Sequence, residues 1–199
     1  MSGTPPFVRH TGRVAALDRA NVDTDQIIPK QFLKRIERTG YGEFLFYDWM
    51  KDPAFELNRP ESAGASILLA GRNFGCGSSR EHAAWALEDY GFKAVIAPSF
   101  GDIFRSNAVK SGLVPVVVAP EAIAALRLAL TDHNALVVDV EALEVRHPDG
   151  LEIPFALDPY DQETLVGGLD DVARTLRREA EIAAYEAAHP ARFDARAPA

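Results

Sequence analysis

The sequence contains a single cysteine, Cys76, among 199 residues. One cysteine cannot form a disulfide within the chain, which is typical of a reducing compartment. One thiolate also cannot hold an iron–sulfur cluster or a structural zinc ion by itself. The five histidines are scattered without the spacing of metal ligands. We therefore expect this chain to bind no metal and no cofactor of its own.

Basic residues and long apolar runs are also scarce. Lysine and arginine number 21 against 29 acidic residues, which gives a net charge of −8. A nucleic-acid-binding domain needs a basic surface, so that class is disfavoured. No apolar run approaches the roughly 20 residues that span a bilayer. The opening MSGTPPFVRH has no apolar signal-peptide core. The sequence predicts a cytoplasmic protein without nucleic-acid or membrane partners.

Hydrophobic residues make up 47% of the chain and charged residues 25%, as in an average globular protein. The apolar runs ASILLAG, KAVIAP and LVPVVV predict strands that are covered on both faces. Helical patterns separate these runs, and Pro120 is placed to start one helix while Gly112 is placed to end another. This alternation predicts an α/β core.

The ends of the chain add to this core. An opening strand is predicted over Phe7–Leu17, and three short strands over 135–157 suggest an attached β layer. A C-terminal helix and a loose tail are predicted over about 169–199. No linker is evident, so we predict one domain over 1–199, with residues 51–65 as a candidate mobile loop.

The stretch FGCGSSREHAAWAL places two glycines, two serines and an arginine before a helical pattern. Gly75 and Gly77 allow positive φ or close approach of the backbone to a ligand. Ser78-x-x-Glu81 has the form of a capping box, which predicts a helix that starts at Ser78. The helix N-terminus and Arg80 would together favour an anion. On the residues alone, simple helix capping and anion binding remain equal alternatives.

Three standard motifs are not met by this stretch. Arg80 stands where the dinucleotide fingerprint needs its third glycine, and neither a P-loop nor a G-x-S-x-G nucleophile elbow is present. A serine hydroxyl such as Ser78 is a poor base unless its alkoxide is stabilised, which Arg80 and a helix N-terminus can do. Cys76 has no triad-like partner, so we interpret it as a small packing residue.

The stretch NVDTDQIIPK gathers acidic residues and a lysine in a segment rich in turn residues. An EF-hand is excluded, because Ile28 stands where glycine is needed and Lys34 where glutamate is needed. The Asp side chains can bond local N–H groups in a solvated turn. Alternatively, a carboxylate here can orient an arginine or a substrate hydroxyl.

Two further segments leave alternatives open. In SFGDIFRSNAVKSG, Asp102, Arg105 and Asn107 follow a strand end, where open α/β sheets gather ligands. For Ser99 and Asp102 we instead predict an N-cap and a capping-box position. The apolar residues of GYGEFLFYDWM fit either a hydrophobic contact surface or ordinary core, and the sequence does not favour one over the other.

Three segments together, NVDTDQIIPKQFLK, GRNFGCGSSREHAAWAL and SFGDIFRSNAVKSGLVP, closely resemble the small subunits of 3-isopropylmalate dehydratase in the aconitase superfamily. The resemblance covers nearly the whole chain. It implies an α/β fold, the swivelling β/β/α domain of the aconitase C-terminal domain. It also implies a hydro-lyase of leucine biosynthesis that converts 2-isopropylmalate to 3-isopropylmalate by dehydration and rehydration. The partner would be a large subunit that carries a [4Fe–4S] cluster on three cysteines.

The same resemblance assigns roles to residues. Ser78 matches the general-base serine that takes the C–H proton, and Ser79 and Arg80 match groups that bind the carboxylate of a dicarboxylate substrate and steady the base. Asp25 matches the Thr-Asp pair near the active site. Residues Gln31 to Ile36, including Lys34, match a loop that faces the variable substrate side chain.

Two alternatives to this function stay open. Related hydro-lyases act on citramalate, dimethylmalate or homoaconitate, and the residues near Lys34 do not distinguish these substrates. A stand-alone anion-binding module without catalysis, which uses the Gly75–Arg80 turn, is the alternative from another class.

Overall fold

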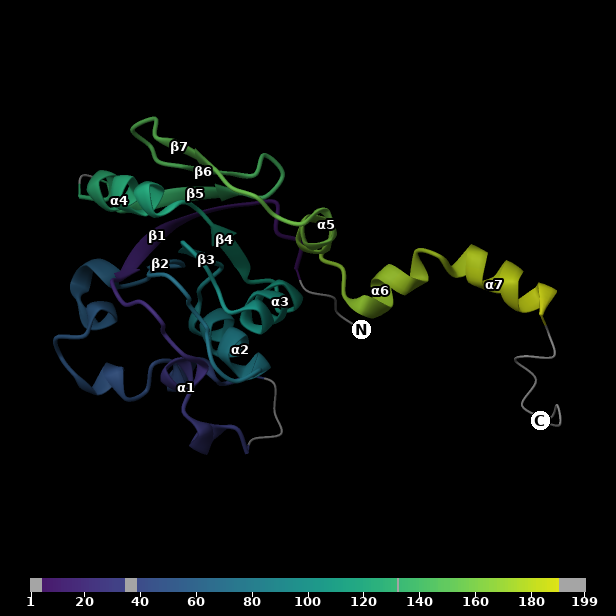
Figure 1. Cartoon of the computed structure of the whole chain (residues 1–199), viewed down its shortest axis with the longest axis horizontal. Coiled ribbons are helices and arrows are strands. Elements are labelled where there is room, and N and C mark those ends of the chain that lie inside the picture. The colour runs from purple at the N-terminus through teal and green to yellow at the C-terminus, as the bar shows by residue number, and fades with distance from the viewer. Residues whose placement is uncertain (1–4, 35–38, 132, 190–199) are drawn as a thin grey trace.

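The computed structural model describes residues 5–34, 39–131 and 133–189. Within these residues, seven strands form one sheet in the order β4-β3-β2-β1-β5-β6-β7 (Figure 1). The strands are β1 (Arg9–Leu17), β2 (Ile67–Ala70), β3 (Ala94–Ala97), β4 (Val114–Val117), β5 (Ala135–Asp139), β6 (Glu144–Arg146) and β7 (Glu152–Pro154).

Strand β1 joins a parallel half of the sheet to an antiparallel half. Its residues 14–17 pair in parallel with β2, and β3 and β4 continue the parallel half. Its residues 9–13 pair antiparallel with β5, which β6 and β7 extend. The predicted α/β core with an attached β layer is therefore confirmed. The opening strand begins two residues later than predicted, at Arg9.

Helices cover both faces of the parallel half (Figure 1). Leu68 packs in a core cluster with α2 and α3, whereas Ile67 and Leu69 pack with α4. This explains why the strands are continuous apolar runs, since neither face meets water. The helices are α1 (Thr24–Ile27), α2 (Glu81–Tyr90), α3 (Asp102–Lys110), α4 (Pro120–Ala129), α5 (Pro159–Gly167), α6 (Asp171–Leu176) and α7 (Glu179–Ala188).

The residues at which these helices begin and end are partly as predicted. Pro120 is the first residue of α4, and Gly112 follows α3 with φ of 80°. The prediction for the start of α3 is wrong, because Gly101, not Ser99, is its N-cap. The hydroxyl of Ser99 instead accepts a hydrogen bond from the backbone N–H of Asn73 at 2.9 Å. A contact with a distant loop has thus replaced the local cap.

Residues 39–65 form short 3-10 turns packed on the sheet layer. These turns are η2 (Gly42–Phe44), η3 (Trp49–Lys51), η4 (Glu56–Asn58) and η5 (Pro60–Ser62), and η1 (Lys30–Phe32) precedes them. Tyr41, Leu45 and Phe46 are buried, which favours the core interpretation of GYGEFLFYDWM. Phe55, Leu57 and Ala65 are buried as well, so three side chains anchor the candidate mobile loop to the core.

The predicted C-terminal helix is two helices, α6 and α7, which extend away from the sheet (Figure 1). Every residue of α7 is exposed. The tail over 190–199 lies outside the described residues. Across the described part of the chain, we find no helix with the length and apolar character needed to cross a membrane.

Candidate functional site

The loops that follow β1, β2 and β3 lie side by side at one edge of the sheet. The N–H of Gly75 donates to the carbonyl of Val22 at 2.8 Å, and the N–H of Gly101 donates to the carbonyl of Phe74 at 2.9 Å. The carboxyl ends of neighbouring parallel strands share one edge, where open α/β sheets bind their ligands. Two of the stretches singled out from the sequence, residues 21–30 and 73–80, therefore meet at this edge.

Gly75 is required by the packing of this edge. Its φ is 71°, and an added Cβ would lie 2.2 Å from Cγ of Phe104. Gly77 also has positive φ, at 94°. The predicted positive φ at both glycines is confirmed. The main role of Gly75 is close packing against α3. This packing brings the serine-containing loop, residues 73–80, next to the loop after β3.

The two aspartates at the start of α1, Asp23 and Asp25, have different partners. Asp23 caps α1, since its Oδ1 accepts from the N–H of Gln26 at 2.8 Å and the Gln26 Oε1 accepts from the N–H of Asp23 at 2.9 Å. The local bonding predicted for this turn is therefore confirmed for Asp23. Asp25 points elsewhere and forms an ion pair with Arg80, as predicted for a carboxylate that orients an arginine.

The Asp25–Arg80 ion pair keeps Asp25 ionised and holds the Arg80 guanidinium in the site. The Arg80 side chain is 11% exposed and that of Asp25 is 41% exposed, and Lys30 Nζ lies 3.6 Å from the second Asp25 oxygen. The hydrogen bond from Arg80 is the largest cause that lowers the pKa of Asp25, and the charges of Arg80 and Lys30 add to it. Asp25 is thus ionised at neutral pH, and it holds the guanidinium in one place.

The predicted capping box at Ser78 is wrong. Helix α2 begins at Glu81 with Arg80 as its N-cap, and no side chain caps it. The chain turns before the helix starts, because the carbonyl of Ser78 accepts from the N–H of Arg80 at 2.9 Å and from the hydroxyl of Thr24 at 3.1 Å. Ser78 is exposed, and its Oγ accepts from Arg80 Nη2 at 3.5 Å instead of capping the helix.

The other predicted substrate-binding residues are exposed. Ser79 lies between Ser78 and Arg80 on the same loop. Lys34 follows η1 and is exposed, and among the described residues no hydrogen bond or ion pair joins it to the serine-containing loop. Residues 35–38 lie outside the described part, so the segment Gln31 to Ile36 is described only as far as Lys34. The structure therefore brings together Asp25, Ser78, Ser79 and Arg80 but does not join Lys34 to them.

Neither Cys76 nor His82 has the features of a catalytic group. Burial is the main cause that raises the pKa of Cys76, and the charge of Asp23 adds to it, so a thiolate is disfavoured. His82 packs against the rings of Tyr41 and Trp85, with centroid distances of 5.2 and 4.7 Å. Burial lowers the pKa of His82, which keeps it neutral at physiological pH.

Phe104 was not predicted as part of the site, and Thr24 was predicted only as the partner of Asp25 in the Thr-Asp pair, without a role of its own. Thr24 is 1% exposed and bonds the serine-containing loop, and Phe104 fills the space above Gly75. The sequence offered only a threonine between two aspartates. Its burial, and the hydrogen bonds that a buried polar side chain requires, are seen in the structure.

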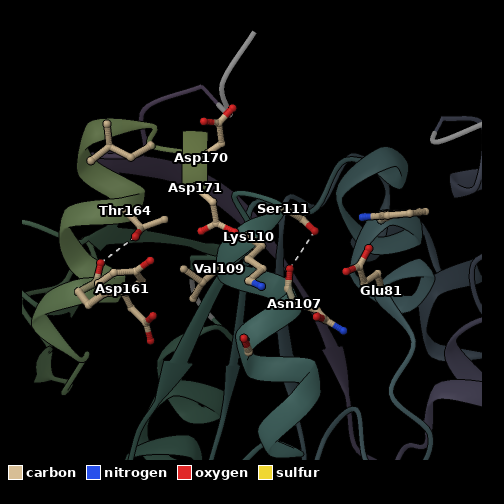
Figure 2. A pocket seen from close by; sticks show the side chains of 13 residues that line it. Glu81, Asn107, Val109, Lys110, Ser111, Asp161, Thr164, Asp170 and Asp171 are labelled. Carbon is tan, nitrogen blue, oxygen red and sulfur yellow. Dashed lines mark hydrogen bonds between the residues drawn. The ribbon is translucent and has the colours of Figure 1, made fainter. Parts of the chain in front are cut away.

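A separate cavity of about 310 Å³ lies between α2, α3, α5 and the start of α6 (Figure 2). Two hydroxyls in its wall are bonded within their own helices: Ser111 Oγ donates to the Asn107 carbonyl at 2.9 Å, and Thr164 Oγ1 donates to the Tyr160 carbonyl at 2.8 Å. None of the predicted site residues lines it. The residues that line it are Glu81, Trp85, Ser106, Asn107, Val109, Lys110, Ser111, Tyr160, Asp161, Thr164, Leu169, Asp170 and Asp171.

Among the described residues, no three His, Cys, Asp or Glu side chains are grouped so that they could hold a metal ion. The donor set does not fit an iron–sulfur cluster either, because the sequence has only Cys76 to offer as a thiolate.

Comparison with known proteins identifies similar chains. The family model of the aconitase C-terminal domain matches residues 4–121. The 3-isopropylmalate dehydratase small subunit of Geobacillus kaustophilus is 54% identical over 191 residues, which cover 92% of this chain and 97% of the relative. The protein of the same name from Acidobacterium capsulatum is 52% identical over 190 residues, which cover 94% and 92%.

A solved structure is also similar. The crystal structure of a 3-isopropylmalate dehydratase from Methanocaldococcus jannaschii matches with a TM-score of 0.64 and 28% identity. The match covers 87% of this chain and 98% of that chain.

Proposed function

The chain belongs to the aconitase C-terminal domain family, and from this premise we propose that it acts as the small subunit of a 3-isopropylmalate dehydratase. The reaction is the dehydration of 2-isopropylmalate and the rehydration of the alkene to 3-isopropylmalate, a step of leucine biosynthesis. Identities above 50% over nine-tenths of the chain support this reaction. The observation that carries our proposal for this chain's part in it is the Asp25–Arg80 ion pair beside the exposed hydroxyl of Ser78.

Ser78 is proposed as the general base that removes the C–H proton of the substrate. A serine hydroxyl needs stabilisation of its anionic form before it can act as a base. Arg80 Nη2, 3.5 Å from Ser78 Oγ, and the uncapped N-terminus of α2 are the positive groups that supply it. Because Ser78 is free of a capping bond, its Oγ is available to the substrate.

Ser79 and Arg80 are proposed to bind a carboxylate of the substrate. The guanidinium offers several N–H groups in a fixed fork, and Asp25 occupies only one edge of it. Asp25 acts by orienting Arg80. Lys34 remains a proposed contact for the substrate side chain, with the family resemblance as its only support.

A large subunit is proposed as the obligatory partner and as the carrier of the [4Fe–4S] cluster. When bound there, such a cluster supplies a Lewis acid for the departing hydroxide. The exposure of Ser78 and Ser79 supports a partner, because a site of this chemistry works when water is excluded from it. A cytoplasmic location is also proposed, with the single cysteine as support.

The proposal is tested by reconstitution. The purified chain is mixed with a cluster-loaded large subunit, and alkene formation from 2-isopropylmalate is followed against each subunit alone. Turnover is expected only in the mixture, and dehydration by the isolated chain would contradict the divided site. The dehydration of citramalate and dimethylmalate and the hydration of homoaconitate are measured in parallel. A higher kcat/KM for any of these than for isopropylmalate would overturn the assigned substrate.

A further inference from the structure

Thr24 makes two hydrogen bonds to the serine-containing loop from a different part of the chain. Its N–H donates to the carbonyl of Cys76 at 2.9 Å, and its hydroxyl donates to the carbonyl of Ser78 at 3.1 Å. The residue is 1% exposed, so water does not compete for these bonds. Thr24 therefore holds the backbone on both sides of Gly77.

The loop needs such a restraint because its own conformation supplies little. Gly77 has φ of 94° and no side chain, and a glycine at this position leaves the chain free to move. An added Cβ at Gly77 would make only ordinary contacts, the nearest with Asp23 Cβ at 3.4 Å, so close packing does not fix this residue. The two bonds from Thr24 span this flexible point.

Thr24 itself is held rigidly. It is the first residue of α1, which the mutual bonds of Asp23 and Gln26 close at its start. Its side chain is β-branched and buried, so it has few rotamers open to it. The next residue, Asp25, grips the guanidinium of Arg80. One short helix therefore fixes both the backbone of Ser78 and the cation that lies beside its hydroxyl.

We propose that Thr24 is a positioning residue for the reaction: its hydroxyl sets the distance between Ser78 Oγ and Arg80 Nη2. This inference rests on the proposed role of Ser78. Without the hydroxyl, the Ser78 carbonyl keeps its bond from the Arg80 N–H but loses the one that ties it to α1. Ser78 Oγ then moves relative to Arg80, and its anionic form is less well stabilised. Displacements of this kind are costly to catalysis even where the fold is kept.

The test compares Thr24→Val, which keeps the shape, with Thr24→Ser, which keeps the hydroxyl, in the reconstituted complex. For Thr24→Val, kcat per assembled complex is expected to fall about tenfold with KM within about twofold, and the pH profile of kcat should move to higher pH. Thr24→Ser should restore kcat to within about threefold and restore the profile. If Thr24→Val assembles poorly, Thr24→Ala serves as the second variant without the hydroxyl.

Ile27→Val is the matched control, because Ile27 is fully buried on the same helix and lies outside the site. It should lower stability and leave kcat per complex and the pH profile unchanged. Full kcat in Thr24→Val, equal loss in Ile27→Val, or no rescue by Thr24→Ser would each overturn the inference. Ser78→Ala separates it from the proposed function. If Ser78→Ala is fully active, the role of Ser78 fails as well, and if only Thr24→Val is fully active, the positioning role alone is wrong.

Discussion

Two carboxylate–arginine clusters, one in each half of the sheet, differ in which partner is buried. In the antiparallel half, the Asp139 side chain is 1% exposed, whereas its partners Arg9 and Arg146 are 59% and 32% exposed. At the carboxyl end of the parallel strands the arginine is the less exposed partner: the Arg80 side chain is 11% exposed and that of Asp25 is 41% exposed. In each cluster, one partner is largely withdrawn from water and the other partner is exposed.

The Asp139 cluster is complete in itself. Asp139 accepts from the N–H of Ala142 at 2.9 Å, from Arg9 Nε at 2.7 Å and from Arg146 Nη2 at 3.2 Å. Burial alone would raise the pKa of Asp139, but these hydrogen bonds and the two arginine charges lower it. A carboxylate used in this way ties strands β1, β5 and β6 together and has little left for a ligand.

The Asp25 cluster is incomplete by comparison. Its arginine is fixed by one carboxylate and lies beside an exposed serine hydroxyl. Asp139, a buried carboxylate between exposed arginines, therefore has a structural role. Arg80, which Asp25 orients beside Ser78, has the arrangement that we propose for binding a substrate carboxylate.

The largest effect is expected from Asp139→Asn. The amide cannot replace the charged acceptor of the hydrogen bonds from Ala142, Arg9 and Arg146 at this buried position, which should lower the free energy of unfolding by about 3 kcal/mol. Denaturant titration of the chain measures this loss. The kcat per assembled complex should not change. A variant of wild-type stability would break the distinction between the two clusters.

Asp25→Asn should give the opposite pattern. Because this ion pair is partly exposed, its loss should lower stability by less than about 1 kcal/mol. Arg80 loses its orientation, so kcat should fall about tenfold or more. Steady-state kinetics of the reconstituted complex and denaturant titration give the two numbers. A large loss in the free energy of unfolding with an unchanged kcat would show that Asp25 has a structural role like that of Asp139.

The smallest effect concerns pH. Asp139 has a lowered pKa in the folded state, so its contribution to stability is present above the unfolded pKa of about 3.9 and is lost as the pH falls through the folded value. The stability gap between the wild type and Asp139→Asn should therefore narrow below about pH 4. For Asp25→Asn the gap should be small at every pH. A gap for Asp139→Asn that stays constant between pH 6 and pH 3 would contradict the assigned cause of its stability.

Sequence patterns predicted what is local or strongly periodic. Residue type and short-range sterics determine the buried strands, the stop of α3 before Gly112 and the start of α4 at Pro120. They also determine the positive φ at Gly75 and Gly77. The family resemblance singled out Asp25 and Arg80, but their contact joins positions 55 residues apart and needs the sheet to form first.

The errors have one physical cause. Ser78-x-x-Glu81 and Ser99-x-x-Asp102 both have the spacing of a cap, yet in both places the N-cap lies two residues later, at Arg80 and Gly101. The Ser78 carbonyl is bound by Thr24, and the Ser99 hydroxyl by Asn73. Local pattern cannot rank a cap against such a tertiary bond, and at Ser78 the lost cap leaves the hydroxyl open for chemistry.

Hydrogen isotope exchange tests the central claim, that Ser78 Oγ takes the substrate proton, most directly. The reconstituted complex is incubated with 2-isopropylmalate in D₂O, and deuterium entry at the carbon that loses its proton is followed by NMR. We predict that Ser78→Ala assembles with the large subunit but exchanges at least about 100-fold more slowly than the wild type. Exchange at the wild-type rate in assembled Ser78→Ala would contradict the account.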